Sequence, residues 1–183
     1  FLVIIFIISG FLIFQQITLT HPKRSGTLTL NGLQNEVATH FDRWGIPHIY
    51  AQNEPDMYFA LGYLHAQDRL FQMEILRRLG KGELSAIVGK KALAIDKLHR
   101  TLQISQHAQN LATSMKPTNP ATIAATSYIK GINTYIKTGP TPLEFHILQI
   151  PKRPFSLEDS FVIAGIMALK FSKALATDLS SLH

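Results

Sequence analysis

The sequence predicts an α+β fold that is mostly helical and carries one short β-hairpin. An alternating apolar pattern with a central turn, at residues 37–51, predicts the hairpin. Apolar residues at helical spacing follow, and further helical segments extend to about residue 173. The chain has 183 residues, of which 46% are hydrophobic and 16% charged, so it is long enough to bury a core of its own.

An apolar segment opens the chain. Residues 1–14 are almost wholly apolar and are interrupted only by Ser9 and Gly10. This length is short for a helical membrane span and suits the core of a signal peptide. Because the sequence starts at Phe1 rather than at methionine, a longer, uncleaved anchor stays open as the alternative. We therefore predict a signal peptide or signal anchor over residues 1–16.

A linker and a hairpin come next. Residues 17–35 are polar and rich in turn-forming residues, which predicts a linker or a short strand. Residues 37–41 and 46–51 then flank an Asp-Arg-Trp-Gly sequence, in which Gly45 can take a positive φ. This pattern predicts two short antiparallel strands joined by a tight turn.

The longest predicted helix follows the hairpin. Asn53 is a good N-cap residue, and glycines at 80 and 82 are typical of a helix end. One apolar row at helical spacing comprises Phe59, Tyr63, Ala66, Leu70 and Met73. Asp68 and Arg69 interrupt the apolar sequence, and buried charge is costly unless it is paired. We expect both to belong to a structural network, as we do Arg77 and Arg78.

Shorter helices fill the rest of the chain. The predicted segments are 83–88, 92–115 in one or two pieces, a helix of about 17 residues from 119–120 onward, and a helix ending near 173. The Pro-Lys-Arg-Pro sequence at 151–154 predicts an extended link. Ser156 and Asp159 behind it form a capping-box pattern.

The composition excludes several kinds of function. The net charge is +6, but the basic residues are scattered and no nucleic-acid-binding motif accompanies them. The absence of cysteine excludes disulfides and a cysteine nucleophile in this chain. The eight histidines show no metal-ligand spacing, and no serine-hydrolase, metalloprotease or phosphate-binding motif is present. We therefore assign no catalytic residue to this chain.

Three sequence blocks resemble the penicillin acylase family, also called penicillin amidases. They read GIPHIYA, GYLHAQDRLFQME and EFHILQIPKRPFSLEDS, and the resemblance covers roughly residues 36–178. It implies an N-terminal-nucleophile hydrolase with a four-layer αββα sandwich. In that family the nucleophile is the first residue, usually serine, of a separate β chain freed by self-cleavage of a precursor. Residues 36–183 would then be the α-chain region of an incomplete enzyme that is inactive alone.

The resemblance also implies a substrate class, a location and a binding site. The expected substrates are N-acyl amides such as β-lactams with an acyl side chain or acyl-homoserine lactones, and the expected location is the periplasm or the periplasmic side of the inner membrane. Met167 and Phe171 match apolar residues of the acyl pocket, and Lys170 matches a basic gate residue that is usually arginine. A structural calcium ion would be bound at Asp178, or at the neighbouring Thr177, and no organic cofactor is implied.

Less specific interpretations stay open for each of these features. The three residues at 167–171 also fit ordinary helix packing, and Asp178 also fits an exposed helix end. The alternative function is a non-catalytic, membrane-tethered helical binding protein, or a degenerate fragment of the enzyme.

Overall fold

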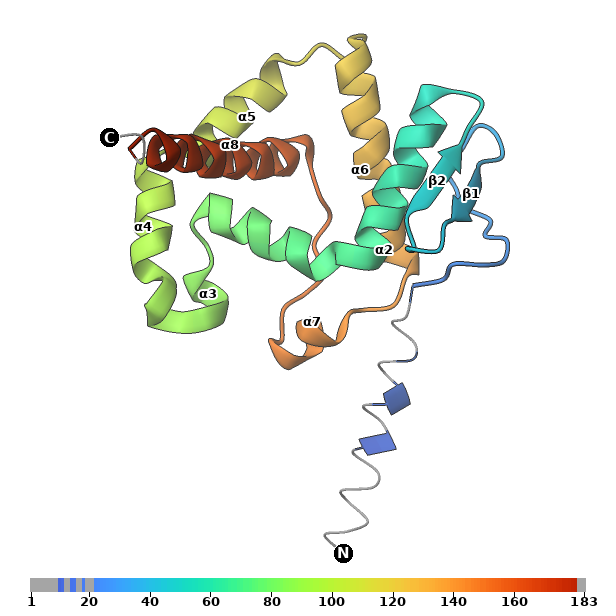
Figure 1. Ribbon diagram of the computed structural model, residues 1–183, viewed down its shortest axis with the longest axis horizontal. Helices are drawn as coiled ribbons and strands as arrows, with labels where there is room; N and C mark the ends of the chain where they lie inside the picture. Colours follow the sequence, from blue (N-terminus) through green and yellow to red (C-terminus); the bar gives the residue numbers. More distant parts are fainter. Residues whose placement is uncertain (1–9, 12–13, 16–17, 19–21, 181–183) are drawn as a thin grey trace, which may run out of the picture.

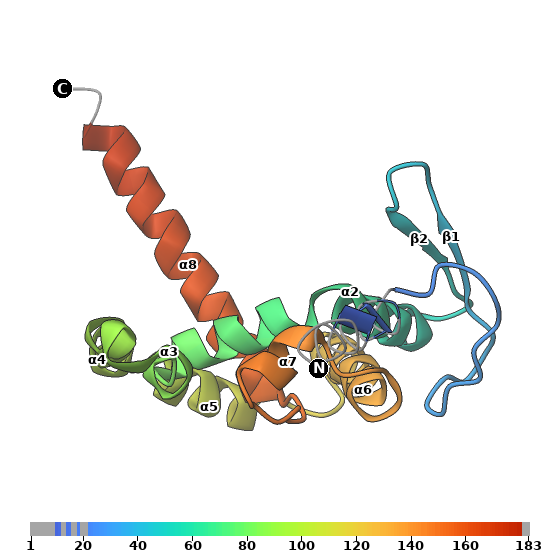
Figure 2. The ribbon, with the colours of Figure 1, turned by 90° about the horizontal axis from the view of Figure 1, so that it is seen from below.

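The computed structural model describes residues 10, 11, 14, 15, 18 and 22–180, with side chains described as far as Ser172. In this part of the chain, eight helical segments follow one β-hairpin, as Figure 1 shows. The helices α2 to α7 lie close to one layer when seen edge-on (Figure 2). On one side of this layer, α8 rises from near the middle and leans toward the α4 end, and the hairpin stands on the same side at the opposite end. The mostly helical α+β prediction is confirmed.

The hairpin consists of β1 (Ala38–Phe41) and β2 (Pro47–Tyr50), which pair antiparallel with His40 opposite His48. The side chain of Asp42 closes the turn by accepting hydrogen bonds from the backbone N–H groups of residues 44 and 46. Gly45 has φ +77°, as the turn prediction requires. Ahead of the hairpin, residues 22–30 form no regular strand, and Asn31 and Leu33 form an isolated β-bridge.

Helix α2 (Glu54–Lys81) begins and ends where the sequence predicts. The side chain of Asn53 accepts a hydrogen bond from the Asp56 N–H at 2.8 Å, and Gly82 ends the helix in the left-handed conformation. Near its middle, Arg69 has non-helical dihedral angles, φ −138° and ψ 19°, and the helix bends there (Figure 1). No proline or glycine marks this break, so it could not be predicted from local sequence signals.

The remaining helices are α3 (Ser85–Val88), η1 (Gly89–Ala92), α4 (Leu93–Thr101), α5 (Ile104–Ser114), α6 (Pro120–Thr138), α7 (Leu143–Ile147) and α8 (Leu157–Ser180). The predicted 92–115 segment is therefore two helices. Helix α6 is 19 residues long, close to the predicted 17. Helix α8 continues beyond the predicted end near residue 173.

The core forms where α2 crosses α6. Its buried residues are Tyr63, Ala66, Leu70, Ile129, Ile132, Tyr135, Ile136, Phe145 and Phe155. Gly62 and Gly131 lie at the crossing, where an added Cβ atom would clash with the partner helix's backbone, at the Tyr128 and Phe59 carbonyls respectively. The two helices are therefore in backbone contact, and their glycines set the distance between them.

Helix α4 attaches to the end of α2 through its polar side. The buried carboxylate of Asp96 accepts hydrogen bonds from the backbone N–H groups of Leu84 and Ser85, at 2.9 and 2.7 Å. Arg100 donates from Nε to the Gly82 carbonyl, and His99 Nδ1 lies 2.6 Å from the Leu79 carbonyl oxygen. These side chains satisfy polar groups at a helix end and the turn that follows it.

The environment of Asp96 predicts a loss of stability in acid. Burial would raise the pKa of Asp96, but the hydrogen bonds from Ser85 and Leu84 outweigh it and hold the pKa below its ordinary 3.8. A carboxylate with a lowered folded-state pKa stabilises the fold above its unfolded pKa, and this stabilisation is lost as the pH falls through the folded value. We expect Asp96→Asn to flatten the decline of the free energy of unfolding that sets in as the pH falls below the ordinary carboxyl pKa of 3.8. Urea titrations at a series of pH values would measure it, and parallel curves for variant and wild type would contradict it.

Among the described residues, no helix has both the length and the apolar character needed to cross a membrane. The predicted leader, residues 1–16, lies largely outside the described residues.

Candidate functional site

The residues predicted to contact substrate lie on α8, and this helix is fixed at its first turn. Ser156 and Asp159 form the predicted reciprocal cap: the Ser156 N–H donates to Asp159 Oδ2 at 2.8 Å, and the Asp159 N–H donates to Ser156 Oγ at 3.3 Å. Asp159 is 3% exposed, so this cap is buried against the rest of the protein. The capping-box prediction is confirmed, with aspartate in place of the usual glutamate or glutamine.

A buried ion-pair network joins this cap to α2. Lys81 Nζ lies 2.7 Å from Asp159 Oδ1, and Arg77 Nη1 donates to Asp159 Oδ2 at 3.4 Å. Both Arg77 and Arg78 also donate to the carboxylate of Glu74, which is 1% exposed. The network therefore runs from the second half of α2 to the start of α8.

The charges in this network stabilise one another's ionised forms. Burial would raise the pKa of Asp159, but the Lys81 ammonium and the Ser156 N–H hold it below the ordinary value. Burial would likewise lower the pKa of Lys81, and its hydrogen bonds to Asp159 and Glu158 raise it instead. Asp159 therefore stays ionised at neutral pH and keeps both of its cationic partners.

Helix α6 fixes the segment that enters α8. Asn133 donates from Nδ2 to the Phe155 carbonyl at 2.8 Å and accepts from the Phe155 N–H at 2.7 Å. The Arg77 guanidinium lies 4.2 Å from the centre of the Phe155 ring, and its Nη1 donates to the Pro154 carbonyl. The start of α8 is thus held by side chains from both α2 and α6.

The three predicted pocket residues come soon after this anchored start. Ile166, which is 2% exposed, packs deeply, whereas the adjacent Met167 is only half-buried. Lys170 is exposed and Phe171 is 73% exposed. At the spacing of 167, 170 and 171, these side chains share one side of the helix. Their assignment to a substrate pocket stays a prediction.

Asp68 and Arg69 do not form the structural network that the sequence led us to expect. Both are exposed, and they lie at the break in α2. The prediction of a network is right for Arg77 and Arg78, which pair with Glu74. The sequence analysis did not identify Glu74 as their partner. The spacing could have indicated it, because Glu74 precedes Arg77 and Arg78 by three and four residues, the spacing of helical ion pairs.

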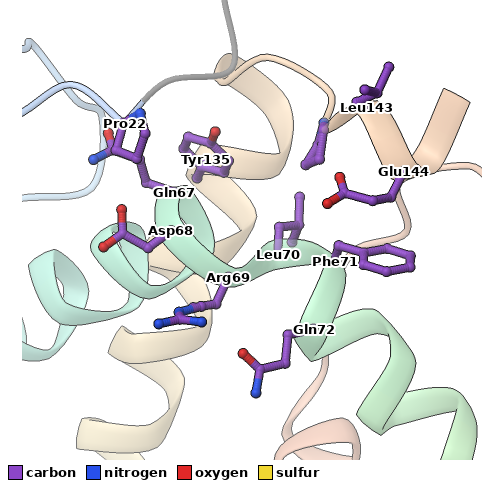
Figure 3. Close-up of a pocket in the computed structure, with 11 residues that line it drawn as sticks. Pro22, Gln67, Asp68, Arg69, Leu70, Phe71, Gln72, Tyr135, Leu143 and Glu144 are labelled. Carbon is purple, nitrogen blue, oxygen red and sulfur yellow. The ribbon is translucent and has the colours of Figure 1, made fainter. Parts of the chain in front are cut away.

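The break in α2 opens a cavity of about 430 Å³ (Figure 3). Asp68, Arg69 and Gln72 come from α2, Tyr135 comes from α6, and Glu144 comes from α7. Burial raises the pKa of Tyr135 to about 12, so its hydroxyl stays protonated at neutral pH.

A second cavity, of about 390 Å³, lies under the segment that leads to the hairpin. Neither of these two cavities includes Met167, Lys170 or Phe171. The pocket expected from the resemblance is therefore not formed by either of them.

The predicted calcium ligands lie where the structure describes the backbone but no side chains. Asp178 and Thr177 belong to α8, but their side chains lie outside the described residues. Where side chains are described, no group of three or more histidine, aspartate or glutamate residues is arranged to hold a metal ion. Calcium binding at Asp178 stays a prediction.

Comparison with known proteins connects this arrangement to one family. Residues 36–183 match the family model described as penicillin amidase. The chain is 37% identical over 149 residues to the penicillin acylase 2 proenzyme of Pseudomonas sp. (strain SE83), covering 81% of this chain and 19% of the proenzyme. It is 32% identical over 160 residues to the acyl-homoserine lactone acylase QuiP of Pseudomonas syringae pv. syringae, and this match covers 86% of this chain and 19% of QuiP.

A solved structure agrees with these matches. The fold is similar to that of a thermostable penicillin G acylase from Alcaligenes faecalis, with a TM-score of 0.66 and 26% sequence identity. This match covers 81% of the present chain and 84% of the solved chain. The chain spans about a fifth of the length of the curated relatives. The family model covers most of the sequence, and the chain therefore belongs to the penicillin amidase family.

Proposed function

We propose that this chain is the α-chain part of an amidohydrolase that hydrolyses the linear amide of an N-acyl substrate. The relatives are named as acylases of penicillin and of acyl-homoserine lactones, which suggests a β-lactam side chain or an acyl-homoserine lactone as substrate. The observation that carries the proposal is a contrast in coverage: the chain covers 84% of the solved acylase chain but 19% of the proenzyme. The solved chain is thus nearly as long as this one, as expected of an α chain cut from a precursor.

The reaction needs a nucleophile, a base and donors for the oxyanion, and this chain contributes none of them. In the proposal, the nucleophile is an N-terminal serine on a β chain made from the same precursor. Its own α-amino group, with an ordinary pKa of about 7.7 to 8.0, can be neutral near pH 7 and accept the hydroxyl proton. The serine oxygen attacks the amide carbonyl, and the protonated α-amino group gives its proton to the leaving amine as the C–N bond breaks. Water then hydrolyses the acyl-enzyme ester, which releases the acid and restores the serine hydroxyl.

The contribution of this chain is one wall of the acyl pocket, formed by Met167 and Phe171, with Lys170 at its edge. The exposure of Phe171 supports this role, because a phenyl ring in water gains stability when an apolar group covers it. Methionine adapts to the shape of an acyl chain, and phenylalanine offers a flat face. Lysine instead of arginine at the edge supplies a point charge without planar, bidentate hydrogen bonding.

The first test is made on the full-length gene product. We expect mass spectrometry of the mature protein to show two chains, and a panel of chromogenic N-acyl amides to be hydrolysed. Fractionation of cells should place the protein in the periplasm or on the periplasmic side of the inner membrane. A single uncut chain without hydrolysis would contradict the proposal and favour the membrane-tethered binding protein.

Substitutions in the acyl wall give a more specific prediction. In the full-length enzyme, Phe171→Ala is expected to lower kcat/KM for a bulky apolar acyl group, relative to an acetyl group, by about tenfold or more. Burying a phenyl ring against the acyl group contributes about 1.5–3 kcal/mol, which the acetyl substrate cannot use. Met167→Ala should act in the same direction, and Ser172→Ala, on the same helix, is the control. An unchanged ratio of the two kcat/KM values in both variants would show that Met167 and Phe171 do not line the acyl pocket.

We extend the proposal to a structural calcium ion held in part by Asp178, an oxygen ligand of the kind that calcium prefers. Calcium titration of the metal-free mature protein by calorimetry would test it. Binding that Asp178→Ala leaves unchanged would place the ion elsewhere.

A further inference from the structure

The two faces of the β-hairpin have different surroundings. Thr39 and Phe41 lie on one face, where they line the second cavity together with Phe59 and Tyr63 of α2. The strand residues of this face are half-buried. On the other face, which we call the outer face, the strand residues and the residue directly before β2 are all exposed: Ala38, His40, Ile46, His48 and Tyr50.

The outer face has the composition of a covered surface. An antiparallel sheet with one face in water usually carries polar side chains there, but the outer face contains no lysine, arginine, aspartate or glutamate. Tyr50 is 61% exposed and Ile46 is 55% exposed. The Tyr50 ring packs edge-on against His40, with 5.5 Å between the ring centres. In the strand register, His40 lies opposite His48, and Ala38 lies opposite Tyr50. The outer face is therefore one continuous patch and not a set of scattered residues.

The hairpin also stands away from the layer of helices, as Figure 2 shows. Each strand has four residues, and an isolated two-stranded hairpin is only marginally stable in water. Trp44, in the turn, is 75% exposed, and the Arg43 guanidinium lies 4.9 Å from the centre of its ring. A further layer packed on the outer face would bury apolar surface and stabilise the hairpin.

The proposed β chain is the partner of the right size and position. The chain spans about a fifth of the length of the curated relatives, so most of such an enzyme lies outside it. In the proposed function, the β-chain serine must approach the acyl wall on α8. Helix α8 and the hairpin stand on the same side of the helical layer (Figure 2). A β chain that reaches the acyl wall therefore lies on the side to which the hairpin projects.

We propose that the outer face of the hairpin is a docking surface for the β chain, which covers Ile46 and Tyr50 with apolar side chains. The inference rests on the proposed function, because it takes the β chain as part of the same enzyme. It assigns the hairpin to the contact between the two chains, at the opposite end of the helical layer from α4.

The test uses the full-length mature protein and one introduced thiol. This chain contains no cysteine, so Ile46→Cys gives it a single thiol, and mass spectrometry of the α chain can follow its labelling by N-ethylmaleimide. The matched control is Ile147→Cys, the same change at a residue of α7 that is 68% exposed. We expect the Ile46→Cys thiol to react at least about tenfold more slowly than the control thiol in the native protein, and equally fast in denaturant. Equal rates in the native protein would overturn the inference.

Photocrosslinking identifies what covers the outer face. The full-length protein is made with p-benzoylphenylalanine in place of Tyr50, which keeps an aromatic ring at this position. We expect irradiation to join this residue to a β-chain peptide. Crosslinks to a second copy of this chain, or to another protein, would overturn the inference.

The outcomes separate the inference from the proposed function. A single uncut chain without hydrolysis would refute both. Two chains that hydrolyse N-acyl amides, with an Ile46→Cys thiol that reacts as fast as the control, would refute the inference alone.

Discussion

Replacing Glu74 with leucine is expected to lower the free energy of unfolding by about 3–5 kcal/mol. Glu74 is 1% exposed and accepts hydrogen bonds from both Arg77 and Arg78, the second at 2.6 Å. Its removal leaves two buried guanidinium groups without their shared carboxylate, and an unpaired buried charge is the costly outcome. Urea unfolding followed by circular dichroism, with wild type in parallel, would measure the loss.

The same region supplies a control for this prediction. Glu83 lies 3.4 Å from Arg153, but Arg153 is 41% exposed and Glu83 is 35% exposed. Because an exposed ion pair contributes little, Glu83→Leu is expected to cost less than about 1 kcal/mol. A cost for Glu74→Leu no larger than that of Glu83→Leu would show that the two arginines reach water or another partner when Glu74 is absent.

A double substitution separates unpaired charge from lost packing. Arg77 is 3% exposed, and its remaining polar partners are Asp159 and two backbone carbonyls. Replacing Arg77 with methionine in the Glu74→Leu background removes one of the two guanidinium groups that lost Glu74, while keeping an apolar side chain of similar length. We expect it to cost less than the sum of the two single substitutions, as coupled neighbours do.

Local signals explain which parts of the fold could be predicted from the sequence. The cap at Asn53, the turn at Gly45 and the cap at Ser156 each depend on residues within four positions of one another, and all three are confirmed. The break at Arg69 has no such signal, since neither proline nor glycine lies beside it. The two halves of α2 pack against different neighbours, the first against α6 at Gly62 and the second against α8 at Gly80.

The contacts around the candidate site could be predicted less well from the sequence, because they join residues that lie far apart in the chain. Glu74 and Arg77 could be paired from their spacing, but Asp159 is 82 residues beyond Arg77, and no periodicity connects them. The roles of Met167 and Phe171 were inferred from the family resemblance. Their pattern alone was insufficient, because apolar side chains on a helix are equally consistent with ordinary helix packing. What the structure adds is the anchored base of α8 and the exposure of the residues that follow it.

The second large effect is expected where α2 crosses α6. A methyl group at Gly131 would clash with the Phe59 carbonyl oxygen, a backbone atom that cannot turn aside as a side chain does. Gly131→Ala must therefore push α6 away from α2 and loosen Ile132, which is 0% exposed, beside it. We expect a loss of about 3 kcal/mol in unfolding free energy, at the upper end for overpacked cores. The gain in helix propensity, about 1 kcal/mol, is too small to offset it.

Gly165→Ala in α8 is the matched control, since it makes the same chemical change inside a helix. An added Cβ atom there would lie 3.1 Å from Cγ2 of Ile104, the end of a side chain that can shift. We expect the free energy of unfolding to stay within about 1 kcal/mol of wild type, because the helix-propensity gain offsets the tight contact. Equal losses at the two positions would show that the clash at Gly131 is relieved without separating the helices. If α6 is displaced in Gly131→Ala, we also expect the start of α8 to lose stability. The reason is that α6 carries Asn133, which holds the backbone of Phe155 at the entrance to α8.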